Sequence, residues 1–207
     1  YILGEWEFYR LPFKVGEGVL IPRQDTETLV DTAARFLRER DAWARKTLDL
    51  CAGSGCIGIA LAKTAAAEVT CVEKSRRAFG YLEENAALNH VSVRAVLGDA
   101  LDENTVTGEY DLIVSNPPYL TESDMRSLQK EVSFEPEAAL FGGTDGLDFY
   151  RGIIPIYARK LVSGGMIAVE IGMGQESAVS GIFRENGLDP RLEKDMRGIY
   201  RVVYGIK

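Results

Sequence analysis

The tetrapeptide Asn116-Pro117-Pro118-Tyr119 follows directly on the apolar run YDLIVS at 110–115. Its prolines remove two backbone N–H donors and prevent a helix, and the first of them also holds Asn116 out of the helical conformation. The result is a stiff peptide that offers the amide oxygen of Asn116, the carbonyl oxygen of Pro117 and the aromatic face of Tyr119. These groups suit a planar NH2 group, because each oxygen can accept one hydrogen while the ring stacks on the plane.

We therefore predict that Asn116, Pro117 and Tyr119 are catalytic and that the whole tetrapeptide, including Pro118, binds the substrate. Holding a nitrogen in front of an electrophile can lower a barrier by about 7–11 kcal/mol in the best cases. The alternative is an ordinary Pro-Pro turn after a strand.

A glycine-rich turn, Asp49-Leu50-Cys51-Ala52-Gly53-Ser54-Gly55, joins the apolar run TLDLC at 47–51 to an apolar helical stretch at about 55–66. Ligands of open α/β sheets bind outside the carboxyl ends of the strands, and glycines there let a ligand approach the backbone. The letters from Gly53 to Gly58 also fit G-x-G-x-x-G. The turn therefore leaves a nicotinamide dinucleotide and S-adenosylmethionine open as ligands, beside a tight turn without a ligand.

Acidic residues follow the next two apolar runs. Glu73 ends VTCVE at 69–73, and its carboxylate could accept both hydroxyls of an unphosphorylated ribose. Asp99 follows VRAVL at 93–97, and it could flank an adenine pocket in which its own backbone or that of Ala100 reads the base edge. The alternative for Asp99 is a loop residue that caps its own turn.

Hydride transfer would need a different set of residues. Tyr157 and Lys160 are three positions apart, so a Tyr-x-x-x-Lys pair is absent, and the single histidine, His90, stands at no plausible proton-relay position. The Asn-Pro-Pro-Tyr tetrapeptide has no role in hydride chemistry either. The residues favour S-adenosylmethionine as the cofactor and N-methylation as the reaction.

The elements that must position these groups alternate between strands and helices, which is typical of a parallel α/β sheet. We expect a β-rich stretch at 6–21, strands at 47–51, 69–73, 93–97, 110–115 and 166–171, and a closing strand pair at 188–195 and 199–206. Helices are expected from Asp25 as N-cap to about 37, and at 55–66, 75–89, 147–162 and 175–186.

The domain prediction is a β-rich segment and helix at 1–46 packed on a catalytic domain at 47–207. No apolar run approaches the ~18 residues that a membrane span needs. The N-terminus also lacks a secretory signal, and because the chain starts at Tyr1 we expect a fragment of a longer protein.

The formal net charge is -7, and the segment from Asp99 to Asp148 holds 12 acidic and two basic side chains. Enzymes of nucleic acids usually carry a basic surface near the site, so this segment argues against a direct nucleic-acid partner and favours a basic protein or a small cation. The three cysteines, Cys51, Cys56 and Cys71, lack zinc or disulfide spacing and are expected to be buried, reduced thiols. We expect no metal site and a surface or packing role for His90.

The combination of D-x-x-x-G-x-G, a strand-ending acid and Asn-Pro-Pro-Tyr resembles class I S-adenosylmethionine-dependent N-methyltransferases, which include enzymes that methylate amino groups of adenine or guanine. Two further segments are similar to those of the release factor glutamine methyltransferases, the HemK/PrmC family. They are Leu20-Ile21-Pro22-Arg23-Gln24-Asp25-Thr26-Glu27 and Val132-Ser133-Phe134-Glu135-Pro136, the latter followed by Ala139-Leu140 and Gly143-Thr144-Asp145-Gly146. The resemblance extends from about Gly4 to the C-terminus.

This resemblance implies a Rossmann-like sheet of seven strands, mostly parallel with a C-terminal antiparallel pair. It implies methylation of the glutamine side-chain nitrogen (N5) in the Gly-Gly-Gln motif of peptide-chain release factors, with S-adenosyl-L-methionine as cofactor. A cytoplasmic enzyme is expected, without direct nucleic-acid or membrane contact, and a monomer. Carried over by position, the cofactor site comprises Cys51, Ala52, Gly53, Ser54, Gly55, Glu73, Asp99, Ala100 and Asn116, while Asn116 to Tyr119 hold the substrate amide.

Two departures from the family pattern bear on these expectations. Cys51 stands where the family usually has glycine, so the backbone geometry of the turn is open to question. The family also has an N-terminal helical domain that helps to dock the release factor, and the printed sequence does not contain it, so weaker substrate binding is expected.

Other functions remain as alternatives. An N-methyltransferase for amino groups of bases in DNA, rRNA or tRNA would share the fold and the tetrapeptide, but the acidic segment and the two family-like segments favour a protein substrate. A nicotinamide-dependent oxidoreductase would leave the tetrapeptide unexplained, and intact Asn116 and Tyr119 argue against a binding module without chemistry. No side chain stands out as a strong base, so we expect positioning to drive the reaction.

Overall fold

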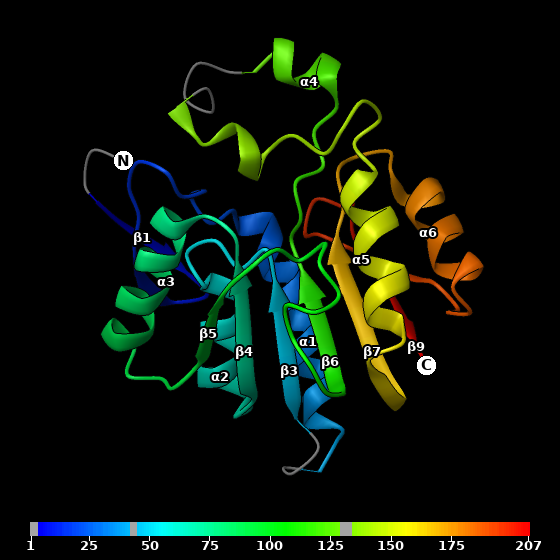
Figure 1. Cartoon of the computed structure of the whole chain (residues 1–207), viewed down its shortest axis with the longest axis horizontal. Coiled ribbons are helices and arrows are strands. Elements are labelled where there is room, and N and C mark those ends of the chain that lie inside the picture. The colour runs from blue at the N-terminus through cyan, green and yellow to red at the C-terminus, as the bar shows by residue number, and fades with distance from the viewer. Residues whose placement is uncertain (1–3, 42–44, 129–133) are drawn as a thin grey trace.

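The computed structural model describes residues 4–41, 45–128 and 134–207, so Val132 and Ser133 of the family-like segment lie outside the described residues. Seven strands form one sheet in the order β5-β4-β3-β6-β7-β9-β8 (Figure 1). The first five in this order are parallel, and β9 and β8 are antiparallel to their neighbours, which confirms the predicted fold class. The strands are β3 (Lys46–Leu50), β4 (Glu68–Glu73), β5 (Arg94–Leu97), β6 (Tyr110–Ser115), β7 (Leu161–Glu170), β8 (Arg191–Lys194) and β9 (Tyr200–Ile206).

Helices cover both faces of this sheet. Alternate residues of a strand point to opposite faces, and Leu112 and Val114 of β6 accordingly pack in one apolar cluster while Ile113 packs in the other. The first cluster contains residues of α1 (Glu27–Arg38), α2 (Cys56–Ala65) and α3 (Arg76–Leu88), and the second contains residues of α5 (Asp148–Ala158) and α6 (Glu176–Glu185). Strand β6 is buried along its whole length, as a parallel strand between two helical layers must be.

The N-terminal segment packs against the same core. Strands β1 (Glu5–Phe8) and β2 (Leu11–Lys14) form an antiparallel hairpin whose Phe8 and Phe13 belong to the apolar cluster of α1 and α2. A short 3-10 helix, η1 (Gln24–Thr26), then leads directly into α1. This path brings residues 18–26 to the carboxyl edge of the sheet, where they line a pocket.

The chain between β6 and α5 lies above the carboxyl ends of the parallel strands in Figure 1. It contains the short helix α4 (Glu122–Arg126), which was not predicted and which begins at a capping box formed by Thr121 and Asp124. It also contains the 3-10 helix η3 (Glu137–Ala139). Backbone hydrogen bonds from Leu120 N to Leu140 O (2.8 Å) and from Gly142 N to Leu120 O (2.9 Å) tie its two ends together.

Two predicted boundaries were wrong. Helix α5 ends at Ala158 and β7 already begins at Leu161, whereas the prediction had a helix to 162 and a strand from 166. Gly164 and Gly165 therefore lie inside the strand, where the register with β6 is irregular. Asp25 is not the N-cap of α1, because η1 carries the chain one residue further and its carboxylate binds two arginines instead.

Within the described ranges, no helix is both long and apolar enough to cross a bilayer.

Candidate active site

The carboxyl ends of β3, β4 and β6 border a pocket of about 270 Å³. Eight of the predicted cofactor residues line it: Cys51, Ala52, Gly53, Ser54, Glu73, Asp99, Ala100 and Asn116. Pro118 lines this pocket as well, and the opposite wall comes from residues 18–26 and 136–139. The fold therefore gathers these residues from six separate segments around one cavity.

The glycine-rich turn leaves open space above its backbone. Cys51, Gly53 and Gly55 all have positive φ angles, of 58°, 56° and 81°. A Cβ added to Gly53 would meet no atom within 4 Å, whereas one added to Gly55 would lie 3.0 Å from Ile59 and 3.1 Å from Leu82. Gly53 thus permits a ligand to approach the turn, while Gly55 shapes the turn from behind and is not among the residues that line the pocket.

Cys51 holds the left-handed conformation that glycine adopts more easily, at a cost of roughly 1–2 kcal/mol for an L residue. The turn therefore keeps a glycine-like backbone although the side chain differs from the family pattern. Burial, and secondarily the charge of Glu73, raises the pKa of the Cys51 thiol to about 12, so it is neutral at pH 7 and does not act as a nucleophile. All three thiols are free; Cys56 and Cys71 are buried as predicted, whereas Cys51 is only half-buried.

Asp49 connects the glycine-rich turn to α2, the helix that follows it, through a hydrogen bond. Its Oδ2 accepts a hydrogen bond from the backbone N–H of Gly58 at 2.9 Å, and its side chain is completely buried. Burial raises the pKa of this carboxyl to about 7, the Gly58 N–H opposes the shift, and the charge of Glu73 adds to it.

We expect the raised pKa of Asp49 to make the free energy of unfolding depend on pH. Because the folded protein holds this proton more tightly than the unfolded chain, stability falls as pH rises from about 4 to about 7 and is then constant, by on the order of a few kcal/mol. Asp49→Asn lacks this dependence, so its stability relative to the wild type should be greater at pH 8 than at pH 5. Urea unfolding at both pH values measures the difference, and equal differences at the two pH values would contradict the assignment.

Glu73 closes the pocket at the end of β4. Its Oε2 accepts from the backbone N–H of Gly53 at 2.8 Å and its Oε1 accepts from that of Ser75 at 2.6 Å. Each carboxylate oxygen can accept more than one hydrogen bond. The side chain therefore connects the turn to the next strand and retains acceptor capacity for a ligand's hydroxyl groups.

Asp99 serves its own loop as well as the pocket. Its Oδ1 accepts from the backbone N–H of Leu101 at 2.9 Å, which is the turn-capping role considered from the sequence, and its Oδ2 pairs with Lys74 Nζ at 2.7 Å. Ala100 beside it is buried and lines the pocket. Phe149 and Ile57 add apolar surface to the same cavity.

Asn116 lies where two cavities meet. A second pocket of about 360 Å³ is lined by Asn116, Pro117 and Tyr119, and its remaining walls come from α4, η3 and the chain around Leu20 and Arg23. Asn116 thus borders both cavities. Its Nδ2 donates to the Thr26 hydroxyl at 3.2 Å, which fixes the side-chain amide from the side opposite its own oxygen.

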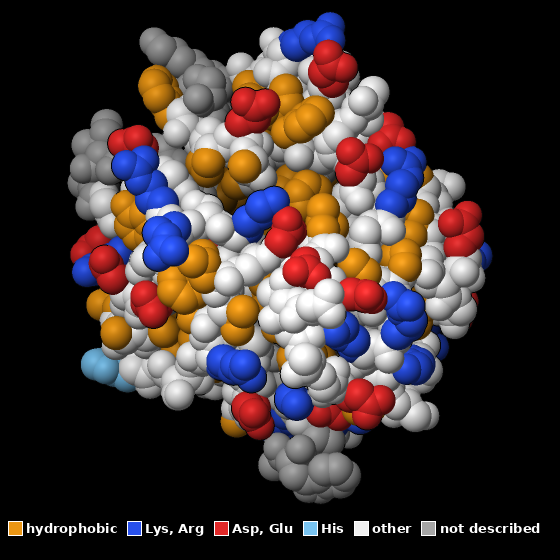
Figure 2. Space-filling view, in the orientation of Figure 1, with side chains coloured by type: hydrophobic (Ala, Val, Ile, Leu, Met, Phe, Trp, Pro, Cys, Tyr) orange, Lys and Arg blue, Asp and Glu red, His pale blue; other side chains and the backbone are white. Residues whose placement is uncertain are grey.

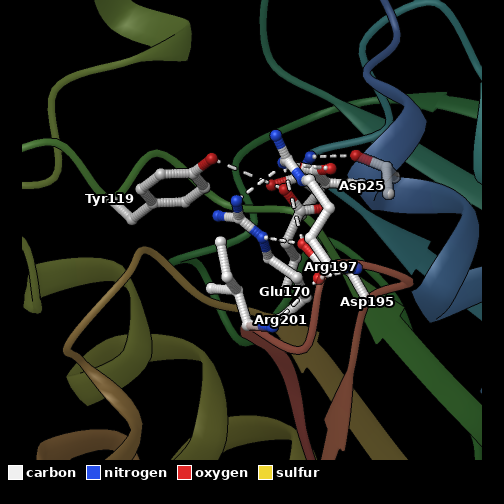
Figure 3. Close-up of polar contacts among 9 residues, drawn as sticks. Asp25, Tyr119, Glu170, Asp195, Arg197 and Arg201 are labelled. Carbon is white, nitrogen blue, oxygen red and sulfur yellow. Dashed lines mark hydrogen bonds and ion pairs between the residues drawn. The ribbon is translucent and has the colours of Figure 1, made fainter.

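Tyr119 leans on the end of the neighbouring strand. Its hydroxyl lies 3.5 Å from Glu170 Oε1, and its pKa is raised well above the ordinary value, chiefly by burial and also by the charge of Glu170 (Figure 3). Beside this pair, Asp25 Oδ2 lies 2.8 Å from both Arg197 Nη2 and Arg201 Nη2, and Arg201 Nε donates to Asp195 at 3.0 Å. Tyr119 is therefore neutral, and it lies beside the cluster of ion pairs formed by these aspartates and arginines.

One ion pair joins the two walls above the sheet. Arg23 lines both pockets and its guanidinium donates to the buried carboxylate of Glu135, which precedes η3. The two family-like segments noted in the sequence, separated by more than 100 residues, thus meet directly over the site.

The acidic segment does not form a surface of one sign. Most of its carboxylates pair with basic side chains, for example Glu103 with Arg159 and Asp111 with Arg40. Figure 2 shows basic and acidic side chains mixed across the face in view. The net charge of the segment is therefore a poor guide to the local field around the site.

The residues present fit S-adenosylmethionine. The turn is open above Gly53, Glu73 offers acceptors for ribose hydroxyls, and Ala100 stands with apolar neighbours suited to an adenine ring. Among the described residues, no group of three or more side chains could hold a metal ion.

Sequence reasoning missed the supports of these groups. Thr26, Arg23 and Glu135 were noted only as parts of family-like segments, and Glu170 only as a residue of an apolar run. Each belongs to a segment distant from the group it contacts, so no spacing rule connects them. His90 is exposed and stands at the end of α3, which agrees with the surface role that was predicted.

Comparison with known proteins identifies the family. The model of the methyltransferase small domain matches residues 26–138. A release factor glutamine methyltransferase of Geobacter sulfurreducens is 46% identical over 208 residues, which cover 99% of this chain and 72% of the relative. Another, of Thermodesulfovibrio yellowstonii, is 40% identical over 207 residues, which cover 98% of this chain and 74% of the relative.

A solved structure shows the same fold at lower identity. A methyltransferase of Pyrococcus furiosus superposes with a TM-score of 0.70 at 18% identity, and the match covers 96% of this chain and 90% of the other. The solved structure supports the fold, while the family model and the two named relatives identify an S-adenosylmethionine-dependent methyltransferase. With its own tetrapeptide at the junction of two pockets, this chain belongs to the release factor glutamine methyltransferase family.

Proposed function

We propose that this protein methylates the side-chain nitrogen of the glutamine in the Gly-Gly-Gln motif of peptide-chain release factors. S-adenosylmethionine occupies the first pocket and the glutamine carboxamide enters the second. The observation that carries the proposal is the position of Asn116, which borders both cavities and so places a bound amide nitrogen next to the cofactor pocket.

The tetrapeptide positions the amide. The Oδ1 of Asn116 and the carbonyl oxygen of Pro117 accept the two hydrogens of the carboxamide NH2 group, and the Tyr119 ring packs on its plane. Prolines at 117 and 118 hold these groups stiffly. The cofactor supplies an electrophilic methyl group on a sulfonium sulfur. Two acceptors on the hydrogens draw the nitrogen lone pair away from the carbonyl and toward that methyl group.

No strong base is needed in this scheme. Tyr119 is neutral because its pKa is raised well above its ordinary value by burial, and Cys51 is neutral for the same reason. The proton leaves during or after transfer, to solvent or to a neighbouring carbonyl oxygen. Positioning accounts for most of the rate enhancement.

Radiolabelled S-adenosylmethionine tests the substrate directly. We expect label to enter an intact release factor and not a variant in which the motif glutamine is replaced by asparagine. Bulk RNA and DNA are the parallel arms, because the alternative is methylation of an exocyclic amino group of a base in DNA, rRNA or tRNA. Label in nucleic acid and none in the release factor would replace the proposal by that alternative.

Glu73→Ala should weaken the binding of S-adenosylmethionine by tenfold or more, since two hydroxyl acceptors and the tie to Gly53 are lost together. Calorimetric titration measures the dissociation constant. Glu68→Ala is the matched control, because Glu68 is an exposed acid at the opposite end of the same strand and should leave affinity unchanged. An unchanged affinity for the Glu73 variant would remove the ribose role from this residue.

The remaining parts of the proposal concern the compartment, the oligomeric state and the contacts of the enzyme. An enzyme that acts on release factors works in the compartment of translation, so we place it in the cytoplasm. We expect it to act as a monomer, without direct contact to nucleic acid or membrane.

A further inference from the structure

Glu170 is a buried carboxylate that lines neither pocket. Glu170 is the last residue of β7, and it is only 1% exposed. Ser115 of β6 pairs with Val169 of β7, so Glu170 stands at the level of Asn116 on the adjacent strand end. A buried charge is costly unless it is compensated, which makes its position beside the tetrapeptide notable.

The carboxylate is surrounded by specific polar groups. The Tyr119 hydroxyl lies 3.5 Å from its Oε1 (Figure 3). The Thr26 hydroxyl, which also contacts Asn116, lies close enough to Glu170 to lower its pKa. Among the described residues, Oε2 has no hydrogen-bond partner of good geometry, although it is fully buried.

Thr26 links Glu170 to Asn116. Thr26 is 1% exposed, and its hydroxyl oxygen accepts a hydrogen bond from Asn116 Nδ2 at 3.2 Å. A hydroxyl has a single hydrogen to donate, and an ionised carboxylate can only accept. With Glu170 ionised, the Thr26 hydrogen therefore points to the carboxylate and its oxygen remains free to accept from the asparagine.

The direction of these hydrogen bonds through Thr26 decides which end of the Asn116 amide faces the substrate. When Nδ2 is held by Thr26, Oδ1 is left for the second pocket, where an acceptor for an NH2 group is required. A neutral Glu170 could donate to Thr26 instead. Thr26 would then donate to the asparagine oxygen, and the amide would turn and present its own NH2 group to the pocket.

We propose that Glu170 is a positioning residue that acts through the Thr26 hydroxyl to keep the Asn116 amide oxygen directed at the substrate nitrogen. The inference rests on the proposed function for its substrate. It adds to that function the residue that determines which end of the Asn116 amide faces the substrate.

The charges around Glu170 place its titration near neutrality. Burial raises its pKa to about 7, and Asp25 on η1 adds to the shift. Thr26, Arg201 on β9 and the Tyr119 hydroxyl lower it.

Two further groups face the residue from the helices. The Cys56 thiol on α2 lies within electrostatic reach, and the Tyr150 hydroxyl on α5 donates to the Glu170 backbone oxygen at 2.9 Å. The pKas of both groups are raised well above their ordinary values, so they stay neutral in this range. The ionised, active form of Glu170 is thus lost as pH falls below about 7.

The first test follows turnover against pH with cofactor and release factor both saturating. Wild-type kcat should fall toward tenfold per pH unit below about 7. Glu170→Gln can offer Thr26 either an oxygen or an NH2 group, so kcat at pH 8 should drop at least tenfold and the low-pH limb should disappear. Affinity for S-adenosylmethionine should stay unchanged, which separates the role of Glu170 from that of the residues that line the cofactor pocket.

Thr26 variants test the link itself and cover the case in which Glu170→Gln does not fold. Thr26→Val removes the hydroxyl at nearly constant shape and should lower kcat and remove the low-pH limb, whereas Thr26→Ser should keep both. Glu193→Gln is the control, because Glu193 is a carboxylate that pairs with Arg35 near the surface and should leave activity unchanged.

A readout without methyl transfer keeps this inference separate from the proposed function. In protein labelled with nitrogen-15, the side-chain NH2 resonances of Asn116, assigned from their loss in Asn116→Ala, should shift with a midpoint near pH 7 in the wild type and not in Glu170→Gln. No titration in the wild type, or the same titration in Glu170→Gln, overturns the positioning role. Failure of the wild type to label a release factor instead defeats the proposed function, and the resonances still decide the inference.

Discussion

Replacement of Asn116 by alanine is expected to lower the rate of methyl transfer by a few hundredfold. The variant removes the side-chain oxygen at the junction of the two pockets, while the carbonyl oxygen of Pro117 remains. Loss of one preorganised polar contact to a reacting group commonly costs about 3–4 kcal/mol in the transition state. Single-turnover methylation of a release factor with enzyme in excess measures the rate. Calorimetric titration should show an affinity for S-adenosylmethionine close to that of the wild type.

Asn104→Ala is the matched control for this variant. Asn104 also donates through its side-chain amide, to Asp102 Oδ1 at 3.1 Å, but it lies in an exposed turn and lines neither pocket. Its rate should equal that of the wild type. Thermal unfolding checks that the loss of the hydrogen bond to the Thr26 hydroxyl leaves the Asn116 variant folded. A rate for Asn116→Ala within fivefold of the wild type would remove the acceptor role from this residue.

The sheet could be predicted because its signals are local. The four strands that end at the site, β3 to β6, lie within one residue of their predicted bounds at each end, since each is a short, largely apolar run followed by turn residues. The error at Gly164 and Gly165 has the opposite origin. Glycines are disfavoured in strands, but pairing of β7 with β6 and β9 on either side outweighs that preference. Tertiary pairing of this kind leaves no trace in the local sequence.

The site likewise contains residues that the sequence predicts and residues that it does not. Asn116 and Glu73 stand immediately at strand ends, and the topology of a parallel sheet then brings them to one edge without further information. Their supports come from far along the chain: Thr26 is 90 residues from Asn116, and Arg23 is 112 residues from Glu135. The contact of Tyr119 with the buried Glu170 likewise depends on the register of β6 with β7. Such contacts follow from the three-dimensional arrangement and not from any spacing in the sequence.

Gly53→Val is expected to reduce the affinity for S-adenosylmethionine by about ten- to a hundredfold. The wild-type turn has open space where the Cβ would stand, and that space belongs to the cofactor pocket. A branched side chain there occupies volume that the ligand needs, and overfilling a close-packed contact of this kind costs about 1–3 kcal/mol or more. It also adds strain, because Gly53 has a φ of 56°, which a β-branched residue rarely adopts. Calorimetry measures the affinity and urea unfolding measures the strain.

Gly187→Val separates these two effects. Gly187 follows α6 with a φ of 76°, and a Cβ there also meets nothing within 4 Å, but the residue is exposed and lies in neither pocket. Both variants should therefore lose comparable stability, while only the Gly53 variant should lose the cofactor. Equal affinities in the two variants would mean that the turn does not contact the cofactor. The open space above Gly53 would then be a property of the fold alone, and the reason for a glycine at this position would have to be found in the backbone angle.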